Sequence, residues 1–122
     1  NDSNMTSNKI NIKVGLKTFT ATLLDNASAK AFKEMLPITI NMIELNGNEK
    51  YHDLSKSLLT NSSNPATIHN GDIMLYGSKT LVLFYKTFST SYSYTKLGSI
   101  DDTTDLASAL RGGNITVTFD KE

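Results

Sequence analysis

The sequence predicts a mainly β protein, built as a closed antiparallel β-barrel of about eight short strands with two short helices capping its ends. In most short segments apolar residues alternate with polar ones, which is the period of a strand with one buried face. Glycine or asparagine separates several of these segments, and no strand–helix–strand rhythm indicates a parallel sheet. We expect the sheet to close because closure removes the unpaired edges of its outer strands.

A change of period predicts the first hairpin and the first helix. Apolar residues alternate over residues 9–14 and again over 19–23, which predicts the two strands of a hairpin. Three- to four-residue spacing then follows at Ala31, Phe32, Met35 and Leu36. This spacing predicts a short helix, capped by Asn26 or Ser28 and ended by Pro37, that plugs an open end of the barrel.

A third strand and a long excursion come next. Residues 38–45 are rich in β-branched side chains and lead into Asn46-Gly47-Asn48, which can adopt the positive φ values of a tight turn. Residues 53–64 contain leucines at a spacing that hints at a helical turn, but residues 60–65 have the composition of a loop. We expect a long surface excursion here.

The second half of the chain predicts another hairpin. Residues 73–76 and 81–88 are strand-like and are separated by Gly77-Ser78-Lys79, a typical turn sequence. A loop of polar and aromatic residues over 90–93 then leads into a strand over 94–100.

A second helix and a last strand complete the predicted elements. Residues 101–104 can cap a helix whose apolar face is formed by Leu106, Ala109 and Leu110, with Arg111 in its last turn. Gly112-Gly113 ends the helix, and alternation over residues 115–119 predicts the final strand.

Composition excludes several classes of site. The length of 122 residues suits one domain, which we expect over residues 9–122 after a flexible polar tail over residues 1–8. Twelve basic residues balance twelve acidic ones, so the broad basic field that nucleic-acid binders need is absent and we expect no nucleic-acid partner. Without cysteine there is no disulfide, thiolate zinc site or iron–sulfur cluster. No apolar run is long enough to cross a bilayer, so we expect no membrane insertion.

The order of these elements resembles that of the cyclophilins, and particular stretches resemble the small bacterial cyclophilin-like domain family. The stretches that carry the resemblance are residues 18–26, Leu36-Pro37, residues 48–51, Gly71-Asp72-Ile73 with Leu75-Tyr76, Phe84-Tyr85, and residues 94–98. The resemblance covers nearly the whole chain from about Ile10 onward, and it implies a closed barrel.

The same resemblance implies a prolyl isomerase site, from which this sequence departs. In cyclophilins an arginine on the strand after the first helix acts beside a hydrophobic pocket, whereas residues 38–45 contain no arginine. The chain's one arginine is Arg111, in the second predicted helix, and only Phe84 or Tyr85 matches a pocket aromatic. Since catalysis requires a donor that weakens amide conjugation, we expect no efficient isomerase activity.

Two polar segments provide the candidate site. Asn46, Glu49, Tyr51, His52 and Asp53 follow a core strand, where a carboxylate beside tyrosine and histidine can bind a peptide amide or act as acid and base. These residues also fit an ordinary turn with a solvated Glu49 and a packed Tyr51 ring. The loop after Phe88 interleaves hydroxyls and aromatic rings, which suit a ligand groove and equally a plain sheet surface.

We therefore expect a groove beside Met42, Glu44, Tyr85 and the loop over residues 89–94. The candidate ligand-binding residues are Met42, Glu44, Glu49, Tyr51, Tyr85, Ser91, Tyr92 and Tyr94. The expected ligand is a peptide or a small molecule, and no catalytic residue is assigned. The alternative is a prolyl isomerase, or another enzyme that uses Glu49, Tyr51 and His52.

Other chemistry lacks the required spacing. His52, His69, Asp53 and Asp72 offer metal-binding side chains, but no two stand at a spacing typical of a metal site, so we expect neither a metal ion nor a cofactor. No G-x-S-x-G elbow, G-x-G-x-x-G or P-loop is present. The polar start and the absence of cysteine fit a bacterial protein that is exported or tethered outside the cytoplasm, which we expect, although cytosolic proteins without cysteine are also common.

Overall fold

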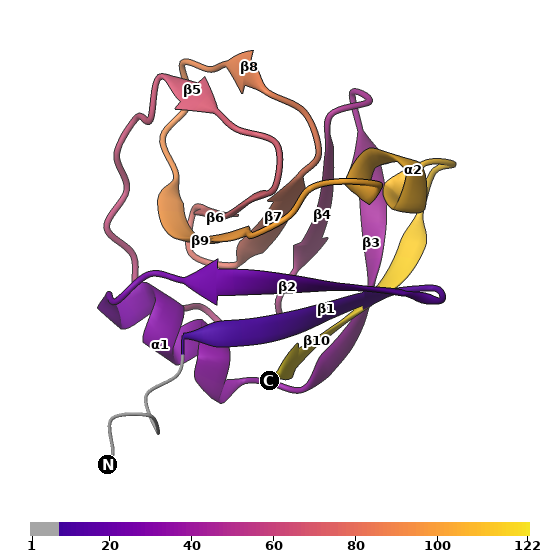
Figure 1. The fold of residues 1–122 in the computed structure, drawn as a ribbon. Helices are drawn as coiled ribbons and strands as arrows, with labels where there is room; N and C mark the ends of the chain where they lie inside the picture. Colours follow the sequence, from indigo (N-terminus) through magenta and orange to yellow (C-terminus); the bar gives the residue numbers. More distant parts are fainter. Residues whose placement is uncertain (1–7) are drawn as a thin grey trace.

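The computed structural model describes residues 8–122 and confirms a closed antiparallel barrel of eight strands with two short helices. Around the barrel the strands follow the order β1-β10-β3-β4-β7-β6-β9-β2 (Figure 1). The elements are β1 (Lys9–Val14), β2 (Lys17–Leu23), α1 (Ala27–Glu34), β3 (Ile38–Leu45), β4 (Glu49–Asp53), β5 (Thr67–Ile68), β6 (Asp72–Tyr76), β7 (Thr80–Phe84), β8 (Phe88–Ser89), β9 (Thr95–Ile100), α2 (Leu106–Leu110) and β10 (Ile115–Lys121). The expected tail over residues 1–8 lies, except for Asn8, outside the described residues.

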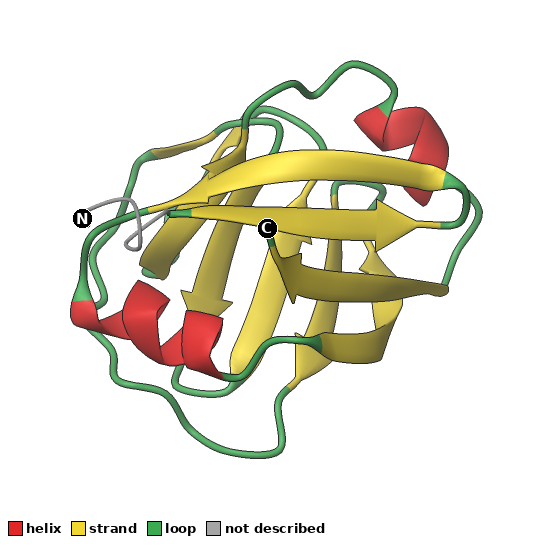
Figure 2. Ribbon diagram, turned by 60° about the horizontal axis from the view of Figure 1, so that its bottom comes forward, coloured by secondary structure: helices red, strands yellow, loops and turns green. Residues whose placement is uncertain are grey.

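The predicted alternation fills the barrel interior. Inward side chains of β1, β2 and β10 are buried, whereas residues between them on each strand are more exposed. The Asn26 side chain caps α1 by accepting the Ala29 N–H at 2.7 Å, which settles the choice between the two predicted caps. Phe32 of α1 packs edge-on against Phe119 of β10, with ring centroids 5.7 Å apart. The two helices lie on opposite sides of the barrel (Figure 2).

Two local expectations were wrong, and one strand was not predicted. Residues 49–53 form β4, which no sequence pattern predicted, and the strand expected over residues 81–88 ends at Phe84. Phe88 begins β8, which pairs with β5 in a separate two-stranded sheet. The expected cap of α2 within residues 101–104 does not form. The helix is preceded by Asp105, in the left-handed conformation at φ 67° and without a side-chain capping bond, whereas the Asp102 carboxylate accepts the Thr104 N–H.

The surface excursion after β4 is fastened to the barrel. Leu54 and Leu58 are buried in the main core, although no helix or strand forms between β4 and β5. The Ser28 hydroxyl of α1 also donates to the Leu59 carbonyl at 2.6 Å. Among the described residues, no helix is long and apolar enough to span a membrane.

A second, smaller apolar cluster lies outside the barrel wall. β6 and β7 are buried on both faces, because one face lines the interior and the other is covered by Tyr94 and by β5 and β8. The members of this outer cluster are Ile68, Met74, Val82, Phe84 and Tyr94. The outer cluster supports the surface on which the candidate site lies.

Candidate functional site

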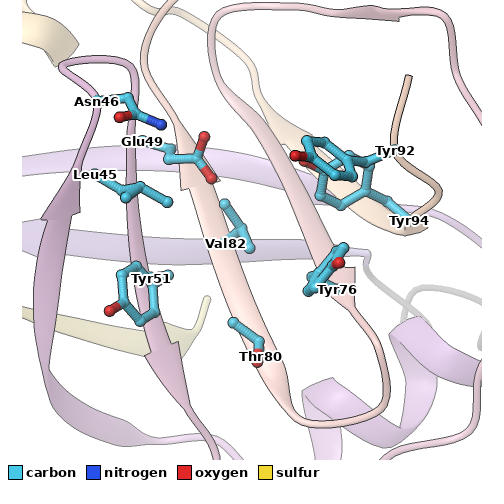
Figure 3. Close-up of a pocket in the computed structure, with 9 residues that line it drawn as sticks. All are labelled: Leu45, Asn46, Glu49, Tyr51, Tyr76, Thr80, Val82, Tyr92 and Tyr94. Carbon is cyan, nitrogen blue, oxygen red and sulfur yellow. The ribbon is translucent and has the colours of Figure 1, made fainter. Parts of the chain in front are cut away.

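A pocket of about 340 Å³ opens on the outer surface of the barrel wall, where β4, β7 and β6 lie side by side (Figure 3). We call it the tyrosine pocket. Its lining consists of Leu45, Asn46, Glu49, Tyr51, Tyr76, Thr80, Val82, Tyr92 and Tyr94.

Strand alternation builds the floor and one wall of this pocket. Glu49 and Tyr51 project from the outer face of β4, and Lys50 between them projects into the barrel. Tyr51 is the cross-strand partner of Val82 on β7, so the Val82 side chain lies beside the tyrosine ring. Figure 3 shows Val82 between Glu49 and Tyr76.

The opposite wall consists of packed tyrosine rings. Tyr76 meets Tyr92 edge-on with centroids 6.1 Å apart and meets Tyr94 at 5.6 Å. Tyr94 is only 6% exposed and packs edge-on against Phe84, whereas Tyr76 and Tyr92 are 47% and 61% exposed. Backbone hydrogen bonds between Tyr94 and Ser63 join this wall to the excursion after β4. Tyr94 is thus a fixed base, and the other two rings form the rim.

Glu49 brings an uncompensated charge to the pocket. Its half-buried carboxylate points into the space that faces the tyrosine rings (Figure 3). Within residues 8–122, no hydrogen bond or ion pair satisfies this carboxylate. Burial, together with the nearby charge of Glu44, raises the pKa of Glu49 above its usual value. Burial and the charge of Glu49 likewise raise the pKa of Tyr94.

A polar cluster occupies the inner side of the same wall. Lys50 is 0% exposed, and its ammonium group donates to Glu44 Oε1 at 2.9 Å and to the Gly113 carbonyl. The Tyr85 hydroxyl donates to the same Glu44 oxygen at 2.6 Å, and the Lys50 ammonium lies 5.7 Å from the Tyr85 ring centroid. Within this inner cluster, the Glu44 carboxylate accepts hydrogen bonds from both the Lys50 ammonium group and the Tyr85 hydroxyl.

The pKa shifts in this inner cluster follow from its contacts. Burial opposes ionisation of Glu44, but hydrogen bonds from Tyr85, Lys50 and Gly47 outweigh it and lower the pKa of that carboxyl. Burial, followed by the hydrogen bond to the Glu44 carboxylate, raises the pKa of Tyr85 well above its usual value. Both shifts favour the observed pairing of a neutral phenol with a carboxylate.

The structure does not bring the eight expected residues together. Glu49, Tyr51, Tyr92 and Tyr94 line the tyrosine pocket. Glu44 and Tyr85 belong to the inner cluster, and Met42 is 0% exposed in the main core. Ser91 lies in the loop before Tyr94, where its carbonyl accepts from the Asn64 side chain at 3.4 Å. Met42 and Tyr85 therefore do not line the pocket as expected, because their side chains point to the inner side of the wall and the pocket lies on its outer side.

Other expected polar residues have local partners. A His52 ring nitrogen lies 3.0 Å from the Asn41 carbonyl, and Asp53 accepts the Thr80 hydroxyl at 2.6 Å. Asp72 is buried and accepts the His69 N–H at 2.8 Å. In the part of the chain that the structure describes, no group of three acidic or histidine side chains could hold a metal ion.

Sequence reasoning missed Tyr76, Thr80 and Val82. The signal for them was the two-residue period of the hairpin: residues 80 and 82 face outward, and Tyr76 lies directly opposite Thr80 across the turn. The alternation is hidden because Leu81, Val82 and Leu83 form one continuous apolar run. Such a run is typical of a strand covered on both faces, and it does not show which side chain faces the pocket.

Comparisons with known proteins agree on the fold. A family model described as the cyclophilin-like family matches residues 12–120. The solution structure of a hypothetical protein from Archaeoglobus fulgidus is similar to this chain, with a TM-score of 0.69, 14% sequence identity and 95% of each chain covered. No curated protein matches the chain. The structural likeness at this identity shows a shared fold.

Proposed function

The chain belongs to the cyclophilin-like family, and from this premise we propose that it is a binding module for a peptide or small ligand, without efficient prolyl isomerase activity. The tyrosine pocket is the observation that carries the proposal. Concave sites lined by aromatic rings and a few polar groups are the usual form of ligand sites. Tyrosine offers a large contact area at low entropic cost, and its hydroxyl supplies hydrogen bonds.

The lining of the pocket supports binding over isomerisation. None of its described residues is an arginine, lysine or histidine, so no cationic donor faces a bound peptide carbonyl or proline nitrogen. Arg111 lies at the end of α2 and not in the pocket. Because isomerisation is accelerated by a donor that stabilises the twisted amide, this lining supports binding without efficient catalysis.

One observation favours the enzymatic alternative. The raised pKa of Glu49 beside Tyr51 and Tyr94 is a property of carboxyl groups that transfer protons. His52, the third residue of this alternative, is not in the pocket lining and contacts Asn41. The alternative therefore reduces to Glu49 with its tyrosine neighbours.

Two measurements test the proposal. We expect backbone chemical shifts of Tyr51, Tyr76 and Tyr92 to change during titration with a library of proline-containing peptides. Tyr76→Ala should weaken the binding, whereas Leu16→Ala, at a fully exposed site in the β1–β2 turn, should not. A protease-free isomerisation assay should give no enhancement comparable to that of ordinary cyclophilins. Shifts confined to the region around α2, or cyclophilin-like rates, would contradict the proposal.

A further inference from the structure

Resting on the proposed function, we infer that the tyrosine pocket selects an organic cation, namely an alkylated ammonium group, over neutral and anionic ligands. Such a group is present on free quaternary ammonium compounds and on methylated lysine side chains of peptides. Three features of the pocket support this ligand class: its charge, the arrangement of its rings and its size.

The charge of the pocket is negative and unshared. Glu49 is its only charged lining residue among those described, and its carboxylate has no partner in residues 8–122. The next carboxylate, Glu44, is held by Lys50 on the inner side of the wall, so that cation does not reach Glu49. A half-buried carboxylate without a partner is costly, and a bound cation would offset this cost.

The rings provide the second attraction. A cation is drawn to the face of a tyrosine ring when it lies within about 6 Å of the centroid. Tyr76 meets Tyr92 at 88° and Tyr94 at 57°, so the three rings that line the pocket differ in orientation. Tyr51 stands on the other side of Val82 (Figure 3). Several rings that converge around one space form the arrangement that recognises alkylated ammonium groups.

Size and polarity favour alkylated over bare cations. A space of about 340 Å³ exceeds the size of a metal ion or an ammonium ion, and Leu45 and Val82 offer apolar contacts to methyl groups. Glu49 is the one carboxylate in the described lining, whereas hard metal ions are usually held by several oxygen ligands, carboxylates among them. An alkylated ammonium group is weakly hydrated and carries its own apolar surface, so it suits both kinds of wall.

Titrations followed by backbone chemical shifts test the inference. The probes are choline, its neutral isostere 3,3-dimethylbutan-1-ol, guanidinium chloride, and an acetylated trimethyl-lysine peptide beside its unmethylated form, all at constant ionic strength. We expect choline and the trimethyl-lysine peptide to shift Tyr76, Tyr92 and Tyr94 and to bind about tenfold more tightly than the isostere and the unmethylated peptide. Comparing choline with the peptide shows which source of the group fits better.

Variants separate the charge from the shape of the pocket. Glu49→Gln keeps the size of the side chain and should weaken choline binding about tenfold while leaving binding of the neutral isostere unchanged. Glu34→Gln, at an exposed position of α1, is the matched control and should bind choline like the original chain.

The outcomes distinguish this inference from the proposed function. Equal binding of choline and its neutral isostere, preference for guanidinium, or no effect of Glu49→Gln would overturn the inference. Binding of a neutral library peptide at the tyrosine pocket would leave the proposed function standing in each of these cases. If neither the library nor any probe shifts a pocket residue, the proposed function itself fails.

Discussion

Glu49 and Lys50 are neighbours in sequence, yet β4 sends their side chains to opposite faces of the barrel wall. Lys50 is completely buried and has a carboxylate, a carbonyl and an aromatic ring around its ammonium group. Glu49 has none of these compensations. One charge therefore stabilises the fold, whereas the other is kept at a cost to the fold, as is common for groups that bind ligands.

Removing the buried cation should destabilise the protein. Lys50→Met keeps a side chain of similar length but removes the cation that pairs with Glu44 and the donor to the Gly113 carbonyl, so we expect a loss of about 3 kcal/mol in the free energy of unfolding. Urea unfolding measures this loss. Adding Glu44→Gln should recover about 1 kcal/mol, since the amide oxygen still accepts the Tyr85 hydroxyl. A double variant no more stable than Lys50→Met would contradict this explanation.

Glu49 should affect stability in the opposite direction. Because the folded protein raises the pKa of Glu49, the folded state binds its proton more tightly than the unfolded chain does. The contribution of Glu49 to stability is then fully present below its unfolded pKa and is lost as the pH rises through its folded pKa. We expect Glu49→Gln to be more stable than the original chain at about pH 7, with a smaller difference at about pH 4, in urea unfolding at both values. A less stable variant at neutral pH would refute the assigned environment.

At the scale of elements, the sequence patterns predicted those strands whose inward residues are apolar. β1, β2 and β10 have clean alternation because one face meets the core. β4 was missed because its fully buried inward residue is Lys50, whose burial depends on partners from β3 and from the backbone at Gly113. A sequence pattern records residue type, and it cannot show that a lysine has been neutralised by residues distant in the chain.

The candidate site was predictable only in part for a related reason. Glu49, Tyr51, Tyr92 and Tyr94 were identified from their chemistry, and they do lie together. Met42 and Tyr85 were wrongly assigned to the same groove, although their side chains lie on the inner side of the wall. The face toward which a side chain points depends on strand register. That register is set by pairing with distant strands and is not visible in one short segment.

The β2–β9 pairing closes the barrel, and it depends on Gly98. A Cβ atom at this position would overlap the Thr22 carbonyl oxygen and lie 2.9 Å from Leu23 Cα, both of which are backbone atoms of β2. We expect Gly98→Ala to cost about 3 kcal/mol, because the strands must separate to admit the methyl group. Ser99→Ala is the control at the next residue and should have a small effect. Thermal or urea unfolding compares the two variants. A mild effect of Gly98→Ala would contradict the expectation, because it would show that β2 and β9 can separate at little cost in stability.

For the molecule as a whole, the closed barrel and the family resemblance were both predictable, since the order of elements extends over nearly the whole chain. The outer cluster was not, because it joins short segments from β5 to Tyr94 that have no clear period. This cluster holds Tyr94 in place and so determines where the pocket forms. The part of the molecule that is hardest to predict is thus the part that shapes the proposed ligand site.

The pairing of the first barrel strand with the last has a practical consequence for protein engineering. Ile10 and Lys121 are direct partners in the β1–β10 ladder, so a short flexible linker can connect residue 122 to residue 8. New ends can then be placed between Gly15 and Leu16, where the turn is exposed and makes no packing contact. We expect this circular permutant to keep the native circular dichroism spectrum and the chemical shifts of the pocket, and an unfolded product would refute the expectation. Such a permutant would place both new ends in the β1–β2 turn, outside the lining of the tyrosine pocket, and give a scaffold for attaching reporters.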